Sequence, residues 1–235
     1  TCTETGLTEG KHCSVCSEIL VKQETVPAKG HTFQNGKCTV CGANDPEWVI
    51  PFKDVAENDW FFEGVKFVFQ NELFNGTSAD TFSPNAPMTR AMLVTVLWRL
   101  DGKTAPKAAC AFTDVNATAY YADAVAWAAE NGVVKGVDET HFAPEAEVTR
   151  EQLAAILFRY AEKKGVDTPK RAALSTFPEA DKVSDYAKDA MAWAVETGLI
   201  NGIKAAKETT RAPQATAQRA QVAAILARDC ESMAK

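Results

Sequence analysis

The stretch "NAPMTRAMLVTVLWRL" at residues 85–100 recurs in altered form as "EAEVTREQLAAILFRY" at 145–160 and "QATAQRAQVAAILARD" at 214–229. In each copy an arginine stands just before apolar residues that are spaced as one face of a helix: Arg90, Arg150 and Arg219. A cation in the first turn of a helix is unfavourable, because the helix N-terminus already carries partial positive charge. An unfavourable feature that occurs three times indicates that these arginines have a specific task.

The residues around these stretches also repeat. Between the first two copies the landmarks match at an offset of sixty residues: Phe52 and Phe112, Asp54 and Asp114, Trp60 and Tyr120, Gly76 and Gly136, and Thr89 and Thr149. The third copy continues the series with Phe177, Tyr186 and Gly202, but Gln218 replaces the threonine and Arg211 replaces the loop phenylalanine. We therefore predict three helix–loop–helix repeats, at residues 50–105, 110–168 and 175–233.

The second helix of each repeat has an apolar stripe, which includes Leu93 and Leu97, Leu153 and Leu157, and Val222 and Leu226. A helix cannot bury such a stripe alone, so we expect the three helices to pack together around a pseudo-threefold axis. The predicted fold class is mainly α, with one pseudo-threefold helical domain. A small cysteine-rich, zinc-ribbon-like module at residues 1–45 precedes it.

Composition excludes several classes of function. The 235-residue chain has 46% hydrophobic residues and a net charge of −6, which argues against a nucleic-acid partner. No apolar run reaches the roughly 18–20 residues of a membrane span, and the abrupt start at "TCTETG" is typical of a fragment or a processed product. The chain has no glycine-rich phosphate loop and no nucleophile beside a base, so we predict neither an enzyme nor an organic cofactor.

Five of the seven cysteines lie within the first 41 residues. Cys13 and Cys16 form one CxxC pair, and Cys38 and Cys41 form another, which together supply the four ligands of a tetrahedral structural zinc. An alternative ligand set is Cys2, Cys13, Cys16 and His31, and disulfides are a third interpretation in an oxidising compartment. A segment with so few large apolar residues needs one of these cross-links.

Thr89 and Thr149 suit the N-cap position of the helices that follow, and Gln152 completes a capping box in the second repeat. An arginine in the next position makes sense if it and the unpaired backbone N–H groups bind a carboxylate or a phosphate. The competing interpretation is that the arginine pairs with Asp54 or Asp114 of a neighbouring repeat.

Two further sets of side chains lie near these arginines in the repeat. Trp60, Tyr120 and Tyr186 are either core residues or a platform for a sugar ring. Arg99, Arg159 and Arg228 lie in the C-terminal halves of the helices, where a cation interacts favourably with the helix dipole.

The pattern Phe-x-Asp-Val, an aromatic-led helix, Gly, Phe-x-Pro and Thr-Arg-x-x resembles the S-layer homology domain, which usually occurs in three tandem copies. The N-terminal pattern "CTETGLTEGKHCSVCSEIL…PAKGHTFQNGKCTVCGA" is similar to Cys- and His-bearing repeats that precede anchoring domains in Gram-positive surface proteins. Met92, Gln152 and Gln221 stand where the domain's motif has glutamate.

The resemblance implies a non-catalytic module that binds secondary cell-wall polysaccharide, commonly pyruvylated, and so attaches proteins to the bacterial cell surface. It implies grooves in which Arg90, Arg150 and Arg219 contact the pyruvyl carboxylate, with Thr89, Thr149, Trp60, Tyr120, Asp54 and Asp114 around them. Because its cap and loop have changed, Arg219 is expected to contribute least. The rival interpretation is a protein-interaction or scaffolding module of a larger surface protein.

Overall fold

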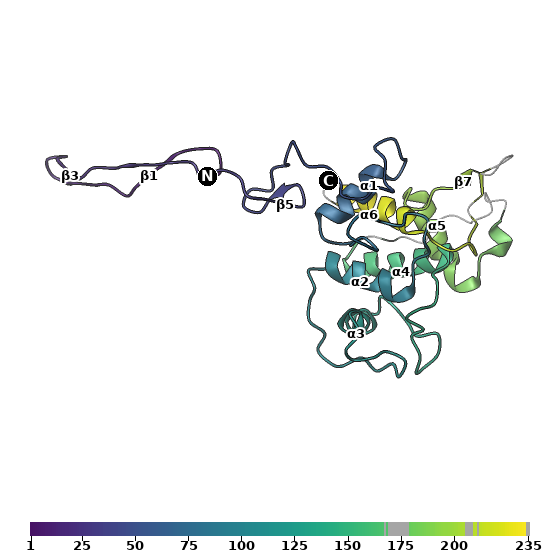
Figure 1. Ribbon diagram of the computed structural model, residues 1–235. Coiled ribbons are helices and arrows are strands. Elements are labelled where there is room, and N and C mark those ends of the chain that lie inside the picture. The colour runs from purple at the N-terminus through teal and green to yellow at the C-terminus, as the bar shows by residue number, and fades with distance from the viewer. Residues whose placement is uncertain (167, 169–178, 205–208, 211, 234–235) are drawn as a thin grey trace. The chain divides into compact units, whose positions relative to one another are not determined.

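The computed structural model describes residues 1–166, 168, 179–204, 209–210 and 212–233 (Figure 1). The chain divides into two compact units, Thr1–Ile50 and Pro51–Lys235, which are considered separately here. Phe177 and Arg211, two landmarks of the third predicted repeat, lie outside the described residues.

The first unit consists of short antiparallel hairpins. Its strands are β1 (Gly6–Leu7), β2 (Lys11–His12), β3 (Ile19–Val21), β4 (Thr25–Val26), β5 (Phe33–Gln34) and β6 (Lys37–Cys38). Strand β1 pairs with β4, β2 with β3 and β5 with β6. The strands are two or three residues long and β1 to β5 are exposed along their whole length, so pairing alone gives this unit little stability.

The second unit carries the helices. Its described α-helices are α1 (Phe62–Gln70), α2 (Arg90–Leu100), α3 (Ala122–Glu130), α4 (Arg150–Lys163), α5 (Lys188–Glu196) and α6 (Arg219–Met233). Two 3₁₀ helices, η2 (Ala180–Lys182) and η3 (Asp185–Ala187), and one hairpin of β7 (Ile203–Lys204) and β8 (Thr209–Thr210) complete its described elements. The helices that were expected to begin at the three repeated arginines do begin there.

Each short helix packs on the long helix of another predicted repeat. Helix α3 contacts α2, α5 contacts α4, and α1 contacts α6, so each predicted repeat contacts the other two. These six helices are labelled in Figure 1. Gly64 permits the α1–α6 contact, because an added Cβ would lie 2.7 Å from the Cα of Ala224. The leucine and valine stripes of the long helices are buried, with Leu93, Leu153 and Leu226 fully inaccessible to solvent.

The predicted fold class, a mainly α pseudo-threefold helical domain with a zinc-ribbon-like module, is wrong. Only about a third of the residues are helical, and the described chain also contains eight short strands in four two-stranded antiparallel sheets. The apolar periodicity located the helices correctly, but the rest of each sixty-residue period forms hydrogen-bonded turns, which apolar periodicity does not report. The first unit has no helix among its described elements.

Candidate functional site

The three arginines at the helix starts are buried. Arg90 is 8% exposed, Arg150 is 3% exposed and Arg219 is 6% exposed. Each reaches into a loop that belongs to another part of the chain: Nε and Nη2 of Arg90 donate to the carbonyls of Phe142 and Lys135, both at 2.8 Å. The unfavourable position in the first turn therefore serves to join segments that are about fifty residues apart in the sequence.

Arg219 makes the same pair of contacts with an earlier part of the chain. Its Nε donates to the carbonyl of Phe82 and its Nη2 to that of Asn75, both at 2.8 Å. Its guanidinium carbon lies 4.6 Å from the ring centroid of Phe82, as that of Arg90 does from the ring of Phe142. The sequence ranked Arg219 lowest, but its bonds and its ring contact match those of Arg90.

Arg150 makes the equivalent Nη2 contact, with the residue before Gly202, and also contacts a side chain. Its Nη2 donates to the carbonyl of Asn201 at 2.7 Å, and its Nη1 donates to the side-chain oxygen of Gln221 at 3.2 Å. Gln221 is one of the residues that replace the motif's glutamate, so an amide occupies the place of a carboxylate beside this arginine.

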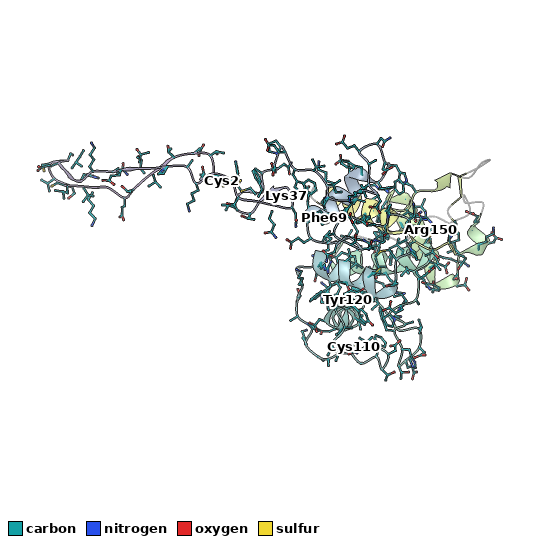
Figure 2. The ribbon with its side chains drawn as sticks, in the orientation of Figure 1. Cys2, Lys37, Phe69, Cys110, Tyr120 and Arg150 are labelled. Carbon is teal, nitrogen blue, oxygen red and sulfur yellow. The ribbon has the colours of Figure 1, made fainter. Side chains whose placement is uncertain are left out.

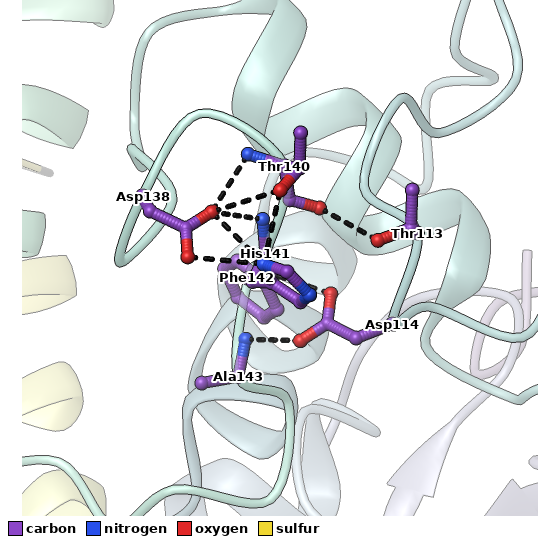
Figure 3. A network of polar contacts seen from close by, with 7 residues as sticks. All are labelled: Thr113, Asp114, Asp138, Thr140, His141, Phe142 and Ala143. Atoms are coloured by element: carbon purple, nitrogen blue, oxygen red, sulfur yellow. Dashed lines mark hydrogen bonds and ion pairs between the residues drawn. The ribbon is translucent and has the colours of Figure 1, made fainter.

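Asp54 and Asp114 support the loops that receive the arginines. The carboxylate of Asp114 accepts the backbone N–H groups of Phe142 and Ala143 at 2.9 and 2.7 Å, as Figure 3 shows. Since the carbonyl of Phe142 accepts from Arg90, one residue connects the aspartate to the arginine. Asp54 holds the N–H groups of Phe82 and Ser83 in the same way, at 2.8 and 2.7 Å.

The same loop is held in a second way near Gly136. Asp138 accepts the N–H groups of Thr140 and His141 at 2.8 Å, and these bonds, with the side chain of His141, lower the pKa of Asp138 to about 2 (Figure 3). A Cβ on Gly136 would lie 2.2 Å from the carbonyl oxygen of Asp138, so only glycine fits there. The carbonyl of the preceding residue, Lys135, accepts from Arg90, and the tight turn fixes its position.

The threonine caps form as predicted. Thr89 accepts the N–H of Met92, and Thr149 and Gln152 form the complete capping box. The first N–H groups of these helices also have partners, because Arg90 and Arg150 donate theirs to the carbonyls of Ala146 and Ala215. The helix N-termini therefore offer few free N–H groups, and any anion site here depends on the guanidinium groups.

Burial lowers the pKa of Arg90 and of Arg219 below the ordinary value. A guanidinium nevertheless stays protonated in proteins, so both charges remain. The ion pairs within the described residues include neither of these two arginines, whose partners are neutral carbonyl groups. Their positive charge is thus oriented but not neutralised by a carboxylate in contact.

Two grooves each combine one of the repeated arginines, Arg150 or Arg219, with an exposed aromatic ring. The Trp60 groove has a volume of about 530 Å³ and is lined by Trp60, Arg150, Asn201, Gln221, Ile225 and Arg228, among others. The Tyr120 groove has a volume of about 460 Å³ and is lined by Tyr120, Arg219, Asn75, Met92, Thr95 and Arg99, among others. Arg150 and Tyr120 are labelled in Figure 2.

The aromatic residues of the grooves are exposed rather than part of the core. Trp60 is 67% exposed and Tyr120 is 62% exposed. The lining of these grooves also includes Arg228 and Arg99, whose Nη1 atoms donate to the carbonyls of Gly198 and Leu73 at 3.0 and 2.9 Å. Sequence analysis treated these two arginines only as partners of the helix dipole and missed their place in the grooves.

The third repeat has Tyr186 where the first two have Trp60 and Tyr120, and we call its surroundings the Tyr186 position. There the carboxylate of Glu151 lies against the tyrosine hydroxyl. Glu151 is 3% exposed, and its carboxylate accepts from Tyr186 Oη at 3.1 Å and from Ser184 N and Oγ at 3.0 and 2.8 Å. Burial and the neighbouring Glu151 raise the pKa of Tyr186 to about 12. Glu151 was not among the predicted site residues. The signal that could have identified it is a charged residue where the other two repeats have alanine, Ala91 and Ala220.

The structure does not bring the two CxxC pairs together. Among the described residues, one group combines three or more side chains able to hold a metal ion: Cys2, His31, Cys38 and Cys41. Their ligand atoms all lie within 4.8 Å of one another, whereas Cys13 and Cys16 are outside the group. Cys2 and His31, which belong to the alternative ligand set, therefore lie beside Cys38 and Cys41, where Cys13 and Cys16 were predicted.

Comparisons with known proteins find similarities that include part of the helical unit. The family model of the S-layer homology domain matches residues 51–91 and 111–154, which fall within the first two predicted repeats. The chain is 33% identical over 153 residues to an endoglucanase of Bacillus sp. (strain KSM-635), and this match covers 65% of the chain and 16% of that protein. It is 32% identical over 171 residues to the surface-layer 125 kDa protein of Lysinibacillus sphaericus, covering 73% of the chain and 14% of that protein.

A third relative is the cellulosome-anchoring protein of Acetivibrio thermocellus, which is 29% identical over 128 residues, covering 48% of the chain and 26% of that protein. The chain therefore spans about a quarter or less of the length of these three relatives. The domain match together with the surface-layer and anchoring relatives confirms the predicted extracellular location at the cell surface or cell wall. Among the described residues, no helix has both the length and the apolar character that crossing a membrane requires.

Proposed function

We propose that residues 51–233 form a non-catalytic anchoring module that binds an anionic secondary cell-wall polysaccharide through the Trp60 groove and the Tyr120 groove. The polymer is bacterial and carries a carboxylate such as a ketal-linked pyruvate. The observation that carries this proposal is the charge of Arg219, which has no carboxylate in direct contact within the described residues, beside the exposed ring of Tyr120.

A buried cation without a carboxylate partner favours an anion that arrives from outside. Arg219 uses Nε and Nη2 for the two loop carbonyls, and within the described residues its Nη1 makes no hydrogen bond. The two carbonyls fix the orientation of the guanidinium, so a ligand carboxylate does not have to order a flexible side chain. A charge-assisted bond to the ligand would contribute about 1.5–3 kcal/mol, which is about ten- to a hundredfold in affinity.

The exposed aromatic rings supply the other half of the site. A pyranose has an apolar face, and an exposed ring such as Trp60 or Tyr120 offers a flat apolar surface to it. Arg228 and Arg99 add positive charge to the linings of the Trp60 groove and the Tyr120 groove, respectively. A groove that combines an aromatic surface with cations suits an acidic sugar better than a neutral one.

The proposal is tested with purified native walls, walls stripped of secondary polymer, and walls from which only the pyruvyl group has been removed. The full chain should bind native walls at least tenfold more tightly than either treated wall. Trp60→Ala and Tyr120→Ala should each weaken binding several-fold without changing helix content, since both side chains are exposed. Tyr186→Ala is the matched control and should leave wall binding unchanged.

Equal binding to native and stripped walls would contradict the proposal and favour a protein-interaction or scaffolding module. Equal binding to native and depyruvylated walls would show that the pyruvyl group is not the anion that the arginines bind.

A further inference from the structure

The N-terminal unit gathers four metal-binding side chains from parts of the chain that are far apart in sequence. Cys2 lies at the start of the unit, His31 follows the central hairpins, and Cys38 and Cys41 flank the turn after β6. Two cysteines separated by two residues, with two further ligands elsewhere, are the usual composition of a structural zinc site.

The distances between the ligand atoms fit one ion. Cys2 Sγ lies 3.9 Å from Cys38 Sγ, and Cys41 Sγ lies 3.4 Å from His31 Nδ1. Zinc–sulfur bonds of about 2.3 Å and zinc–nitrogen bonds of about 2.0–2.1 Å at tetrahedral angles place two sulfur ligands about 3.8 Å apart and a sulfur and a nitrogen about 3.6 Å apart. Both observed separations lie close to these edges of a tetrahedron.

The backbone holds the ligands in place without help from packing. The Asn35–Gly36 turn between β5 and β6 has positive φ at both residues, 49° and 77°, as a two-residue hairpin turn requires. Gly42 donates its N–H to the carbonyl of Cys38 at 2.9 Å and closes the turn that carries Cys41. Gly30 donates its N–H to the carbonyl of Cys2 at 3.0 Å, and this bond brings Cys2 close to His31.

The unit has almost no other interior. Within residues 1–49 the buried residues are Cys2, Gly36 and Cys38, so the only buried side chains are two thiols. The large apolar side chains are exposed instead, among them Val15 at 93% and Ile19 at 70%. A unit of this size without an apolar core requires a metal or disulfide cross-links to fold.

We propose that Cys2, His31, Cys38 and Cys41 bind one zinc ion and that this ion, rather than a hydrophobic core, holds the N-terminal unit together. Four protein ligands leave no open coordination position, so the ion is structural and takes no part in catalysis. Cys13 and Cys16 belong to a separate turn and are not needed for this ion.

The experiment measures zinc content in the full chain purified without chelator and under reducing conditions. The parent should contain one zinc per chain. A Cys38→Ser, Cys41→Ser double variant should lose it, whereas the matched Cys13→Ser, Cys16→Ser variant should keep it. Replacement of zinc by Co²⁺ adds a readout of geometry, because tetrahedral cobalt with thiolate ligands gives intense visible and charge-transfer absorption.

Three results would overturn the proposal. These are metal-free protein whose mass shows disulfides among the four residues, equal loss of zinc from both double variants, and full zinc retention in the Cys38→Ser, Cys41→Ser variant. The helical unit serves as an internal control, because its helix signal should be the same in all these proteins.

Discussion

The Tyr120 groove and the Tyr186 position come from matching places in the sequence, yet one is an open groove and the other contains a carboxylate of the protein. Glu151 follows Arg150 in α4, and the matching residue after Arg90 in α2, the helix that contacts α3, is Ala91. The hydroxyl of Tyr186 donates to Glu151, whereas that of Tyr120 makes no hydrogen bond within the described residues. A single side chain therefore distinguishes the Tyr120 groove, where we propose that an external anion binds, from a position that already holds an internal carboxylate.

A difference in chain length explains why the glutamate is needed. In the second segment, Asn116 accepts the N–H and the hydroxyl of Thr118, both at 2.9 Å. The corresponding turn in the third segment, Val183–Tyr186, is two residues shorter than Val115–Tyr120 and has no such asparagine. Glu151 takes over as the acceptor for Ser184, so a shorter turn was compensated by a side chain from α4.

The largest effect is expected from Glu151→Ala. The change leaves Ser184 N–H, Ser184 Oγ and Tyr186 Oη without their buried acceptor, so the helical unit should lose about 2–4 kcal/mol of unfolding free energy. Urea unfolding followed by the far-UV signal of the helices measures this, since the N-terminal unit contributes no helix among its described residues. Glu151→Gln keeps one acceptor oxygen and should lose less.

Wall binding provides the second readout for the same variant. Glu151→Ala removes a negative charge close to Tyr186, where Arg90 and Arg159 also act. Because more positive charge is then available to an anionic polymer, the variant should bind native walls as well as the parent or better. A stability loss below about 0.5 kcal/mol, which is the scatter of ordinary surface substitutions, would show that Glu151 is not the acceptor on which this turn depends.

Sequence analysis predicted what is local in this comparison. The helix starts at Arg90, Arg150 and Arg219 and the caps at Thr89 and Thr149 follow from neighbouring residues, and the structure has them. The partners of the same arginines are carbonyl groups about fifty or more residues away. Every residue has a carbonyl group, so no pattern of side chains identifies which one will accept.

The cysteines illustrate the same limit. The CxxC spacing identified the turn that carries Cys38 and Cys41, but the path of the chain decided that Cys2 and His31, rather than the other pair, lie beside it. The fold class failed for a related reason, because the turns between the helices are built from backbone hydrogen bonds and from residues with positive φ such as Ser83 and Ala143.

A smaller effect is expected from Asp114→Asn, which tests the loop that receives Arg90. An amide offers one acceptor oxygen in place of two, so one of the N–H groups of Phe142 and Ala143 loses its partner, at a cost of about 1–3 kcal/mol. Asp54→Asn, with the same two contacts in the first segment, should have the same effect. Equal unfolding free energies for the variants and the parent would contradict this role.

The sign of the pH dependence follows from the pKa of Asp114. Partial burial opposes its ionisation, but the N–H groups of Phe142 and Ala143 outweigh burial and hold the pKa below its ordinary value of 3.8. The folded state therefore binds the proton less readily than the unfolded state, and the stabilisation is complete above that ordinary value. The contribution of Asp114 to the free energy of unfolding should disappear as the pH falls below 3.8 and passes through the lowered pKa. In Asp114→Asn, the free energy of unfolding should lack this decrease.

The smallest effect compares the two tyrosine hydroxyl groups directly. Tyr186→Phe removes the bond from Oη to the Glu151 carboxylate, and because Tyr186 is 55% exposed we expect a loss of only about 0.5–1.5 kcal/mol. Tyr120→Phe removes a hydroxyl that has no hydrogen bond within the described residues, so its unfolding free energy should equal that of the parent. Both variants keep the aromatic ring, so wall binding should change by less than about threefold, unless the Tyr120 hydroxyl itself contacts the ligand. A Tyr186→Phe variant as stable as Tyr120→Phe would remove the distinction between the two sites. A Tyr120→Phe variant with weakened wall binding and unchanged stability would instead add a hydroxyl contact to the Tyr120 groove.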